Sequence, residues 1–172
     1  VLTYLIICLL LAMYWSREPA PIPLEYTNAP VIVGVSTTSA LINVADTVLN
    51  KPGGYLSNDI SLPGVWLDNI PSWEYGALIQ VRDLSKTLRE SFSRSQSQST
   101  EDKDLVIAEP RFNFDTQSWI FPSSESVYRE GIEHLERYQA RLVDSDKTNA
   151  QFYARADNLN SWLATVESRL GS

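Results

Sequence analysis

Cysteine and histidine are almost absent from this sequence of 172 residues, which has only Cys8 and His134. One cysteine cannot form a disulfide within the chain, and the two residues are too few for a cysteine–histidine zinc site. Basic residues are also scarce, since 14 lysines and arginines stand against 21 aspartates and glutamates, giving a formal net charge of −7. A negative chain without a basic stripe is not expected to bind nucleic acid.

Several sequence motifs of known chemistry are missing as well. We find no glycine-rich phosphate loop, no dinucleotide fingerprint and no nucleophile elbow. The sequence therefore predicts no catalytic residues, no metal ligands and no cofactor, and it identifies no small-molecule substrate. We expect a protein that is not an enzyme.

A hydrophobic run at the start of the chain is the most conspicuous feature present. Residues 1–15 contain no charged side chain. As a helix they would be about 22 Å long, short of the roughly 30 Å hydrocarbon core of a bilayer. Tyr14 and Trp15 stand just before Arg17, where aromatic side chains meet lipid headgroups. We expect residues 1–16 to be a transmembrane helix that is cut short, because the chain begins with Val1 rather than methionine; a cleaved signal peptide and a buried core helix are alternatives.

The segment after this run is rich in proline and poor in positive charge. Prolines at four positions predict an extended stalk over residues 17–35: Pro19, Pro21, Pro23 and Pro30. Residues 31–35 could form a short strand or an extended segment. Between residues 16 and 60 the only cations are Arg17 and Lys51. Because cytoplasmic flanks are enriched in such residues, we expect the following domain on the far side of the membrane.

Apolar residues spaced by three and four predict a helical domain over residues 36–172. Four helices are expected, at about 38–49, 72–93, 124–143 and 149–170. A polar loop is expected near 93–104, and residues 105–121 are predicted as an extended segment that lays aromatic side chains between helices. The chain is thus predicted to be all-α, with an incomplete transmembrane helix, a stalk and a bundle-like domain of at least four helices. The unbroken apolar stripe of the last helix favours a truncated C-terminus.

Three segments carry a resemblance to a known family. They are Asn-Lys-Pro-Gly-Gly-Tyr-Leu-Ser-Asn-Asp at 50–59, the serine-rich stretch 93–99, and Gln-Phe-Tyr-Ala-Arg-Ala-Asp-Asn-Leu at 151–159. Together the chain resembles a family of bacterial single-pass inner-membrane proteins known only as a domain of unknown function. The resemblance covers nearly the whole chain. It implies a bacterial inner-membrane location and a longer parent protein with residues missing at both ends, and it supplies no activity or site residues.

Two loops offer the most unusual local chemistry. Gly53 and Gly54 permit a left-handed backbone, and Tyr55 can stack, so this stretch is either a helix stop or a loop that docks on a partner or the membrane face. Trp66 and Leu67 are either core residues or an exposed anchor, with the core favoured. The residues proposed for partner contact are Tyr14, Trp15, Gly53, Gly54, Tyr55, Trp66 and Leu67.

The single histidine does not by itself predict a functional site. His134 lies between Glu133 and Glu136 at the margin of an apolar helix face, so we expect a surface histidine. With Glu130 nearby, a metal site would still need residues from a second chain.

The function that these observations favour is an interaction or assembly component of an envelope membrane complex. Its partners would be other membrane-protein subunits and the lipid bilayer, and its domain would lie on the periplasmic side. A carboxylate-dependent cell-envelope hydrolase using Asp59, Asp68 or Asp115 is the alternative. A third possibility is a module for an apolar ligand, with a cavity lined by the aromatic side chains of residues 112–121.

Overall fold

The computed structural model describes residues 1–22, 32–95, 100–144, 146 and 148–171. Its helices are α1 (Leu2–Trp15), α2 (Val35–Asn50), α3 (Asn69–Thr87), α4 (Leu105–Phe112), α5 (Ser124–Val143) and α6 (Ala156–Leu170). A 3₁₀ turn, η1 (Gly64–Trp66), precedes α3, and a π-helical turn, η2 (Leu88–Phe92), extends it. The described residues contain no strand, which confirms the all-α prediction. No described helix combines the length and the apolar character needed to cross a membrane.

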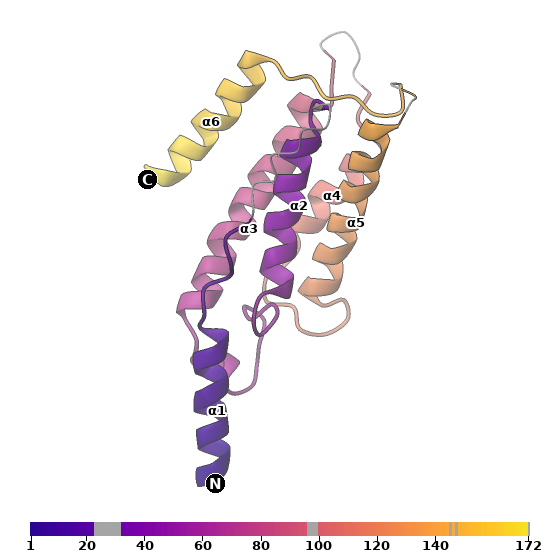
Figure 1. Cartoon of the computed structure of the whole chain (residues 1–172). Helices are drawn as coiled ribbons and strands as arrows, with labels where there is room; N and C mark the ends of the chain where they lie inside the picture. Colours follow the sequence, from indigo (N-terminus) through magenta and orange to yellow (C-terminus); the bar gives the residue numbers. More distant parts are fainter. Residues whose placement is uncertain (23–31, 96–99, 145, 147, 172) are drawn as a thin grey trace.

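Helices α2, α3, α4 and α5 form the body of the molecule (Figure 1). Helix α5 packs against α2 on one side and α4 on the other, and α3 contacts α2 and α4. The fully buried side chains come from all four helices and include Val48, Val81, Phe112, Leu135 and Tyr138. In each helix the apolar residues are spaced three or four positions apart, which places them on one face and brings these faces together in one core.

Local contacts fix how α4 sits on its neighbours. Gly131 of α5 gives the ring of Phe112 room, since a β-carbon there would lie 2.9 Å from that ring. Arg82 of α3 donates hydrogen bonds to the carbonyl oxygens of Phe112 (2.6 Å) and Phe114 (3.0 Å), which close the end of α4. Helix α4 is therefore held from both sides although it has only eight residues.

The prediction of an extended segment over residues 105–121 is wrong for its first half, which is α4. The Asp102 carboxylate begins this helix by accepting hydrogen bonds from the amides of Asp104 (2.9 Å) and Leu105 (3.3 Å). Pro110 favours a helix boundary because it lacks an amide donor, but it falls inside α4, whose buried Leu105, Ala108 and Phe112 pack against the neighbouring helices. Residues 113–123 form neither helix nor strand, but the prediction that this segment lays its aromatic side chains between helices is wrong for Trp119 and Phe121, which are exposed.

Other boundaries differ from the sequence predictions by a few residues. Helix α2 begins at Val35 after Gly34 in a left-handed turn (φ 91°), so the described part of 31–35 is a turn and not a strand. Helix α3 begins at Asn69, with Pro71 in its first turn. Helix α6 begins at Ala156, not near residue 149. In contrast, Ser123 caps α5 as predicted, accepting a hydrogen bond from the Ser126 amide.

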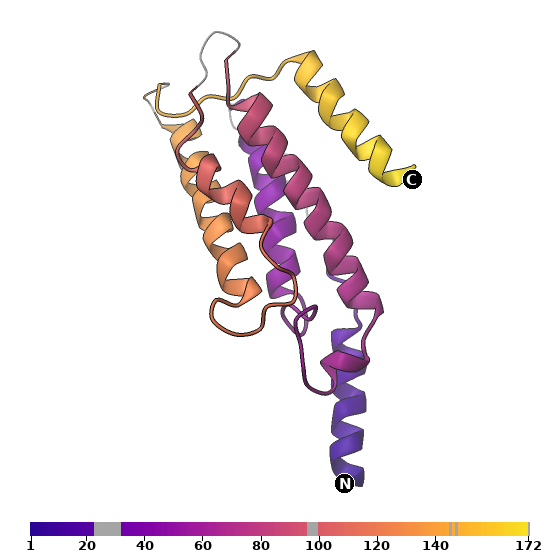
Figure 2. The ribbon, with the colours of Figure 1, turned by 180° about the vertical axis from the view of Figure 1, so that it is seen from behind.

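Helices α1 and α6 stand apart from the body (Figures 1 and 2). Helix α1 projects from the end of the bundle where α2 ends and α3 begins, and α6 leaves the opposite end and contacts α3. Residues 18–22 of the predicted stalk have no regular secondary structure, and its residues 23–31 lie outside the described part. Residues 96–99 of the predicted polar loop lie outside it as well.

Candidate functional site

The segment between α2 and α3, residues 51–68, is called the junction loop because it lies beside the end of α1 (Figure 2). It is built around the carboxylate of Glu74 on α3, whose side chain is fully buried. The amides of Leu56 and Ser57 each donate a 2.8 Å hydrogen bond to this carboxylate, and the Ser57 hydroxyl donates another. Lys51 forms an ion pair with the same carboxylate, and neither charged side chain reaches solvent. The loop is therefore folded about one buried charge pair.

Two glycines give the junction loop its sharp first turn. Gly53 (φ 89°) and Gly54 (φ 72°) both lie in the left-handed region, where a side chain is strained. The Lys51 ammonium donates to the Gly54 carbonyl, which closes the turn. A β-carbon at Gly53 would lie 2.7 Å from the Trp15 ring, so the absence of a side chain lets Trp15 pack on the loop. This contact joins the last residue of α1 to the bundle.

The junction loop is also tied to the connection between α4 and α5, residues 113–123, which we call the α4–α5 loop. The Tyr55 hydroxyl donates to the Thr116 carbonyl (3.0 Å), and its ring meets the Tyr128 ring edge to face at 5.7 Å. The side-chain amide of Asn58 donates hydrogen bonds to the Ser118 carbonyl and the Glu125 carboxylate, both at 2.8 Å. Burial raises the pKa of Tyr55, so its hydroxyl stays protonated and remains a donor.

One carboxyl group in the junction loop, that of Asp59, has a pKa above its ordinary value. The pKa of Asp59 is raised, first by burial and then by the nearby negative charges of Glu125 and Glu74. Its side chain packs on Gly64, where a β-carbon would come within 2.2 Å of it. Asp59 is one of the carboxylates considered for hydrolysis, and its raised pKa is a property that general acids share.

The structure brings only some of the proposed contact residues together. Trp15 and Gly53 touch each other, Gly54 completes the same turn, and Tyr55 is a buried core residue. Tyr14 is exposed, and Trp66 is 51% exposed in η1, so the favoured interpretation of Trp66 as core is wrong. Leu67 is half-buried. Contact between any of these residues and a partner stays a prediction.

Sequence reasoning missed Glu74, although a signal was present. Glu74 stands four residues after Ile70 and four before Leu78, on the apolar stripe of α3. A charged residue at such a position must be paired when the stripe is buried, because burying an isolated charge costs several kcal/mol. The partner could not be read from the sequence, since Lys51 lies 23 residues earlier and in a loop.

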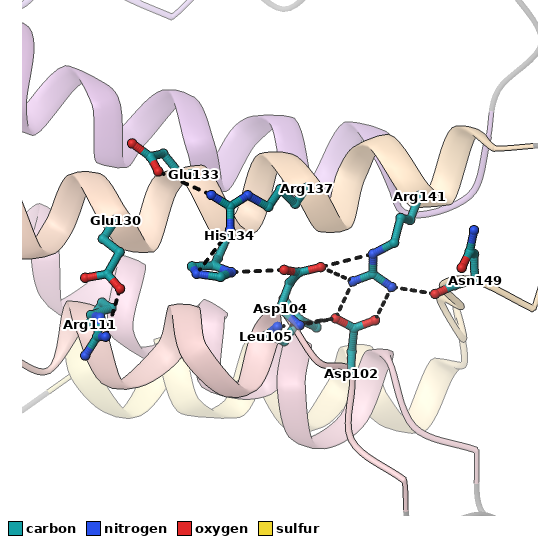
Figure 3. A network of polar contacts seen from close by, with 10 residues as sticks. All are labelled: Asp102, Asp104, Leu105, Arg111, Glu130, Glu133, His134, Arg137, Arg141 and Asn149. Carbon is teal, nitrogen blue, oxygen red and sulfur yellow. Dashed lines mark hydrogen bonds and ion pairs between the residues drawn. The ribbon is translucent and has the colours of Figure 1, made fainter.

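A second polar cluster joins α4 and α5 (Figure 3). The Arg141 guanidinium donates to both oxygens of Asp102 (2.7 and 2.8 Å) and to Asp104 Oδ2 (3.0 Å from Nε). His134 Nδ1 lies 2.9 Å from Asp104 Oδ1. Burial acts to raise the pKa of Asp104, but the hydrogen bonds from His134 and Arg141 outweigh it, and the pKa is lowered.

The prediction of a surface histidine is therefore wrong, because His134 is 8% exposed. Its partner Asp104 stands directly before α4, a helix that the sequence did not predict. Within the described ranges, no three histidine, cysteine, aspartate or glutamate side chains are grouped to hold a metal ion. The cluster serves to clamp two helices, and Figure 3 shows Arg141 reaching both carboxylates from one side.

A hollow of about 410 Å³ lies at the far end of the bundle, under the start of α6. Its lining includes Phe92, Phe152 and Trp162, with the first two rings stacked at 4.8 Å. The buried indole nitrogen of Trp162 has no hydrogen-bond partner among the described residues. The cavity suggested by the sequence would instead lie at residues 112–121, where Phe112 is a fully buried core residue.

The molecule is thus an all-α protein in which a short apolar helix is attached to one end of a four-helix body. The chain belongs to a bacterial family described as "uncharacterized protein conserved in bacteria" (DUF2333), whose profile matches residues 1–172. Neither a curated protein nor a solved structure matches the chain. The resemblance seen in the sequence is confirmed as far as a bacterial family without an assigned function.

Proposed function

We propose that this chain is a membrane-anchored interaction or assembly component of a bacterial envelope complex, with α1 as the anchor. The observation that carries the proposal is the surface of α1. The helix has no charged residue, and apolar side chains are exposed over most of its surface, among them Leu2, Leu5, Ile7, Leu9, Leu10 and Met13; the exception is the face of Cys8, which is buried. Trp15, at the end of this helix, packs on Gly53 of the junction loop.

Lipid is a suitable environment for such a helix. Each large apolar side chain that leaves water contributes roughly 1.5–3 kcal/mol, and α1 has many of them with no polar face to offset the gain. A helix also satisfies its own backbone hydrogen bonds, as a lipid environment requires. Amphipathic surface helices have one polar face, and α1 has none, which favours insertion over lying flat.

The distribution of charge supports a periplasmic position for the body. Arg17 and Lys51 are the cations closest to α1 on its C-terminal side, and Lys51 is buried in its pair with Glu74. A cytoplasmic flank would be expected to carry more lysine and arginine. In a bacterium this favours the periplasmic side of the inner membrane for the body.

The exposed face of α6 supports a role in binding other subunits. Leu159, Leu163 and Leu170 are exposed on this helix, next to the hollow that contains Trp162. An apolar helix face beside an open hollow is a surface that a helix of another membrane protein can cover. The proposed partners are therefore protein subunits of the same membrane, in addition to the bilayer.

Matched pairs of lysine substitutions test both halves of the proposal. Lysine near the middle of a span costs about 3 kcal/mol, so Leu5→Lys with Leu9→Lys should release the full chain from alkali-washed membranes. Leu159→Lys with Leu163→Lys, the control, should stay in the membrane but lose co-purifying subunits. A wild-type chain that washes off membranes would refute the anchor, and one that brings no other subunit with it when purified from its native membrane would refute the assembly role.

The hydrolase alternative has one observation in its favour, the raised pKa of Asp59. Against it, the hollow described above lies at the far end of the bundle from Asp59. Incubation with cell-wall polymer tests this alternative. Release of soluble fragments by the wild type and not by Asp59→Asn, with Asp157→Asn on the exposed side of α6 as the control, would favour hydrolysis over an assembly role.

A further inference from the structure

Large apolar side chains are exposed on both loops at the α1 end of the bundle. The junction loop exposes Ile60, Val65 and Trp66, and the α4–α5 loop exposes Trp119, Ile120 and Phe121. Phe121 is 98% exposed and Trp119 is 54% exposed. We call these six residues the apolar rim. Soluble loops normally present small and polar residues to water, so this rim needs an explanation.

The two loops form one continuous end surface. Asn58 of the junction loop donates to the Ser118 carbonyl of the α4–α5 loop, and Tyr55 donates to the Thr116 carbonyl. Figures 1 and 2, which view the molecule from opposite sides, both show the two loops at the end from which α1 projects. The rim is therefore fixed in position relative to the bundle.

The loops at the opposite end of the bundle are different in character. The described residues directly after η2, before α4 and after α5 are 93–95, 100–104, 144, 146, 148 and 149, and every one of them is polar. In the segment 150–155 that leads to α6, the aromatic side chains of Phe152 and Tyr153 are half-buried. The segment 32–34 before α2 exposes a single aliphatic side chain, Val33, so the exposed aromatic side chains of the rim have no counterpart in the described loops of the other end. An asymmetry of this kind indicates that the two ends face different surroundings.

The charged residues of the two loops indicate what kind of surroundings this end of the bundle faces. Residues 51–68 and 113–123 contain one basic residue, Lys51, and it is buried against Glu74. The exposed charges are carboxylates such as Asp68 and Asp115. The two loops therefore offer no exposed cation to an acidic protein or to anionic lipid headgroups, although Arg17, two residues after Trp15, is exposed. Aromatic and aliphatic side chains without cations suit the boundary between headgroups and hydrocarbon, where tryptophan is enriched.

The position of α1 identifies the occupant as lipid. Trp15, the last residue of α1, packs on Gly53 of the junction loop, so the loop lies beside the final turn of the helix. If α1 enters the bilayer, Trp15 reaches the headgroup level and the rim is brought to the same surface. We propose that this end of the bundle rests on the bilayer, with Trp66, Trp119 and Phe121 in the interfacial layer. This inference depends on the proposed anchoring by α1 and adds a fixed orientation of the body.

Fluorescent labels on the full chain in phosphatidylcholine vesicles test the orientation. In a Cys8→Ala background, single cysteines at three positions carry a polarity-sensitive dye: Leu9→Cys in α1, Phe121→Cys in the rim, and Val143→Cys as the control. Phe121 and Val143 flank opposite ends of α5, and both are exposed. In vesicles, the dye at 121 should shift to the blue and be quenched by lipids that carry a quencher near the headgroup, while the dye at 143 should stay unchanged.

The label in α1 separates the two proposals. A protected dye at position 9 with an unquenched dye at 121 would overturn the orientation and leave the anchor intact. An unprotected dye at position 9 would refute the anchor itself. Equal quenching at 121 and 143 would also overturn the orientation, because the bundle would then lie on its side.

Lipid composition provides an independent check. Because the rim has no exposed cation, replacing half of the phosphatidylcholine with phosphatidylglycerol should not increase quenching at position 121. Quenching that occurs only with the anionic lipid would overturn the proposal in favour of electrostatic docking. Trp66→Ser with Trp119→Ser should reduce quenching at 121 while the dye at position 9 stays protected.

Discussion

At the residue scale, Glu74 determines the shape of the junction loop. Its carboxylate accepts from two backbone amides and a hydroxyl and pairs with Lys51, so four groups converge on two oxygens. A buried pair of this kind contributes little net stability compared with apolar residues, but losing one member leaves an uncompensated charge. The pair therefore specifies one loop conformation more than it adds to stability.

Lys51→Met tests this role. We expect the free energy of unfolding to fall by about 3–5 kcal/mol, because the Glu74 carboxylate would remain buried without its cation. Arg137→Met, the control, removes the cation from the exposed pair with Glu133 and should cost less than about 1 kcal/mol. Urea titration followed by circular dichroism measures both. Adding Glu74→Gln to Lys51→Met should restore part of the loss, and equal losses for Lys51→Met and Arg137→Met would contradict the buried pair.

The lowered pKa of Asp104 leads to an expectation for how the stability of the fold depends on pH. Its pKa in the folded chain lies below its ordinary value of 3.8, so the group stabilises the fold above that pH and this contribution is lost as the pH falls through the folded pKa. We expect Asp104→Asn to be less stable than the wild type at pH 6 and to lose less stability between pH 5 and pH 3. Urea midpoints across this range measure it, with Asp68→Asn as the exposed control. Parallel curves for wild type and Asp104→Asn would refute the linkage.

Two glycine-to-alanine changes should have opposite effects. Gly53→Ala places a side chain in the left-handed region against Trp15, and we expect a loss of at least about 1–2 kcal/mol. Gly76 lies in α3, where an added methyl group would meet no atom within 4 Å, and Gly76→Ala should gain about 0.5–1 kcal/mol. Thermal or urea unfolding compares them. The same sign for both changes would show that the turn at Gly53 is not as described.

At this scale the sequence predicts a structural role where the residue type itself determines which backbone conformations are accessible. Gly53 and Gly54 can be identified as turn residues from their conformational freedom alone. Trp15 cannot be identified as the neighbour of Gly53, because that contact depends on how α1 meets the bundle. Glu74 and His134 occupy buried stripes, but their partners lie far away in the sequence.

At the scale of elements, α6 depends on very few contacts. Asn158 is buried and donates to the Ser91 carbonyl (3.0 Å) and the Tyr153 carbonyl (3.2 Å), which fixes the first turn of α6 to the end of η2. Phe152 stacks on Phe92 just before the helix. Further along α6, the exposed pair of Arg169 with Asp83 is a second attachment to the body.

Asn158→Ala should therefore release α6 without unfolding the bundle. Losing two hydrogen bonds in a buried position costs about 1–3 kcal/mol, which is enough to weaken the attachment of one peripheral helix. We expect faster amide hydrogen exchange in peptides from α6 and unchanged exchange in α5. Asn160→Ala, on the exposed side of the same helix, is the control. Faster exchange in α5 as well would show that α6 is part of the cooperative core.

Long helices can be predicted from the sequence more reliably than short ones. Helices α2, α3 and α5 have 16 or more residues, and their apolar periodicity is sufficient. Helix α4 escapes prediction because its eight residues give barely two turns and contain Pro110. The start of α6 is predicted too early because Phe152 belongs to the apolar pattern but packs from an extended segment.

At the scale of the whole molecule, the surface has an apolar end formed by α1 and the apolar rim. The rim residues are exposed, as are most side chains of α1, and the net charge of −7 belongs to the chain as a whole. This apolar end could not be predicted, because the rim combines loops that are about sixty residues apart in the sequence. The expectation that residues are missing at both ends stays a prediction.

The apolar end should control association in solution. Without detergent, we expect the full chain to associate through α1, and in detergent micelles we expect a monomer, because contiguous exposed apolar surface drives association. Light scattering coupled to gel filtration measures the mass in both conditions. The variant with Leu5→Lys and Leu9→Lys should be monomeric without detergent. A wild-type chain that is monomeric in plain buffer would contradict this expectation.

The hydrogen bonds of the junction loop also impose an order in time as the chain is synthesised. Lys51, Leu56 and Ser57 all precede Glu74, and Asn58 binds groups at Ser118 and Glu125. A ribosome makes α1 and the junction loop before the rest of the bundle, yet the loop cannot acquire its last hydrogen bond until residue 125 has been made. The junction loop is therefore completed late, although its own residues are made before those of α3.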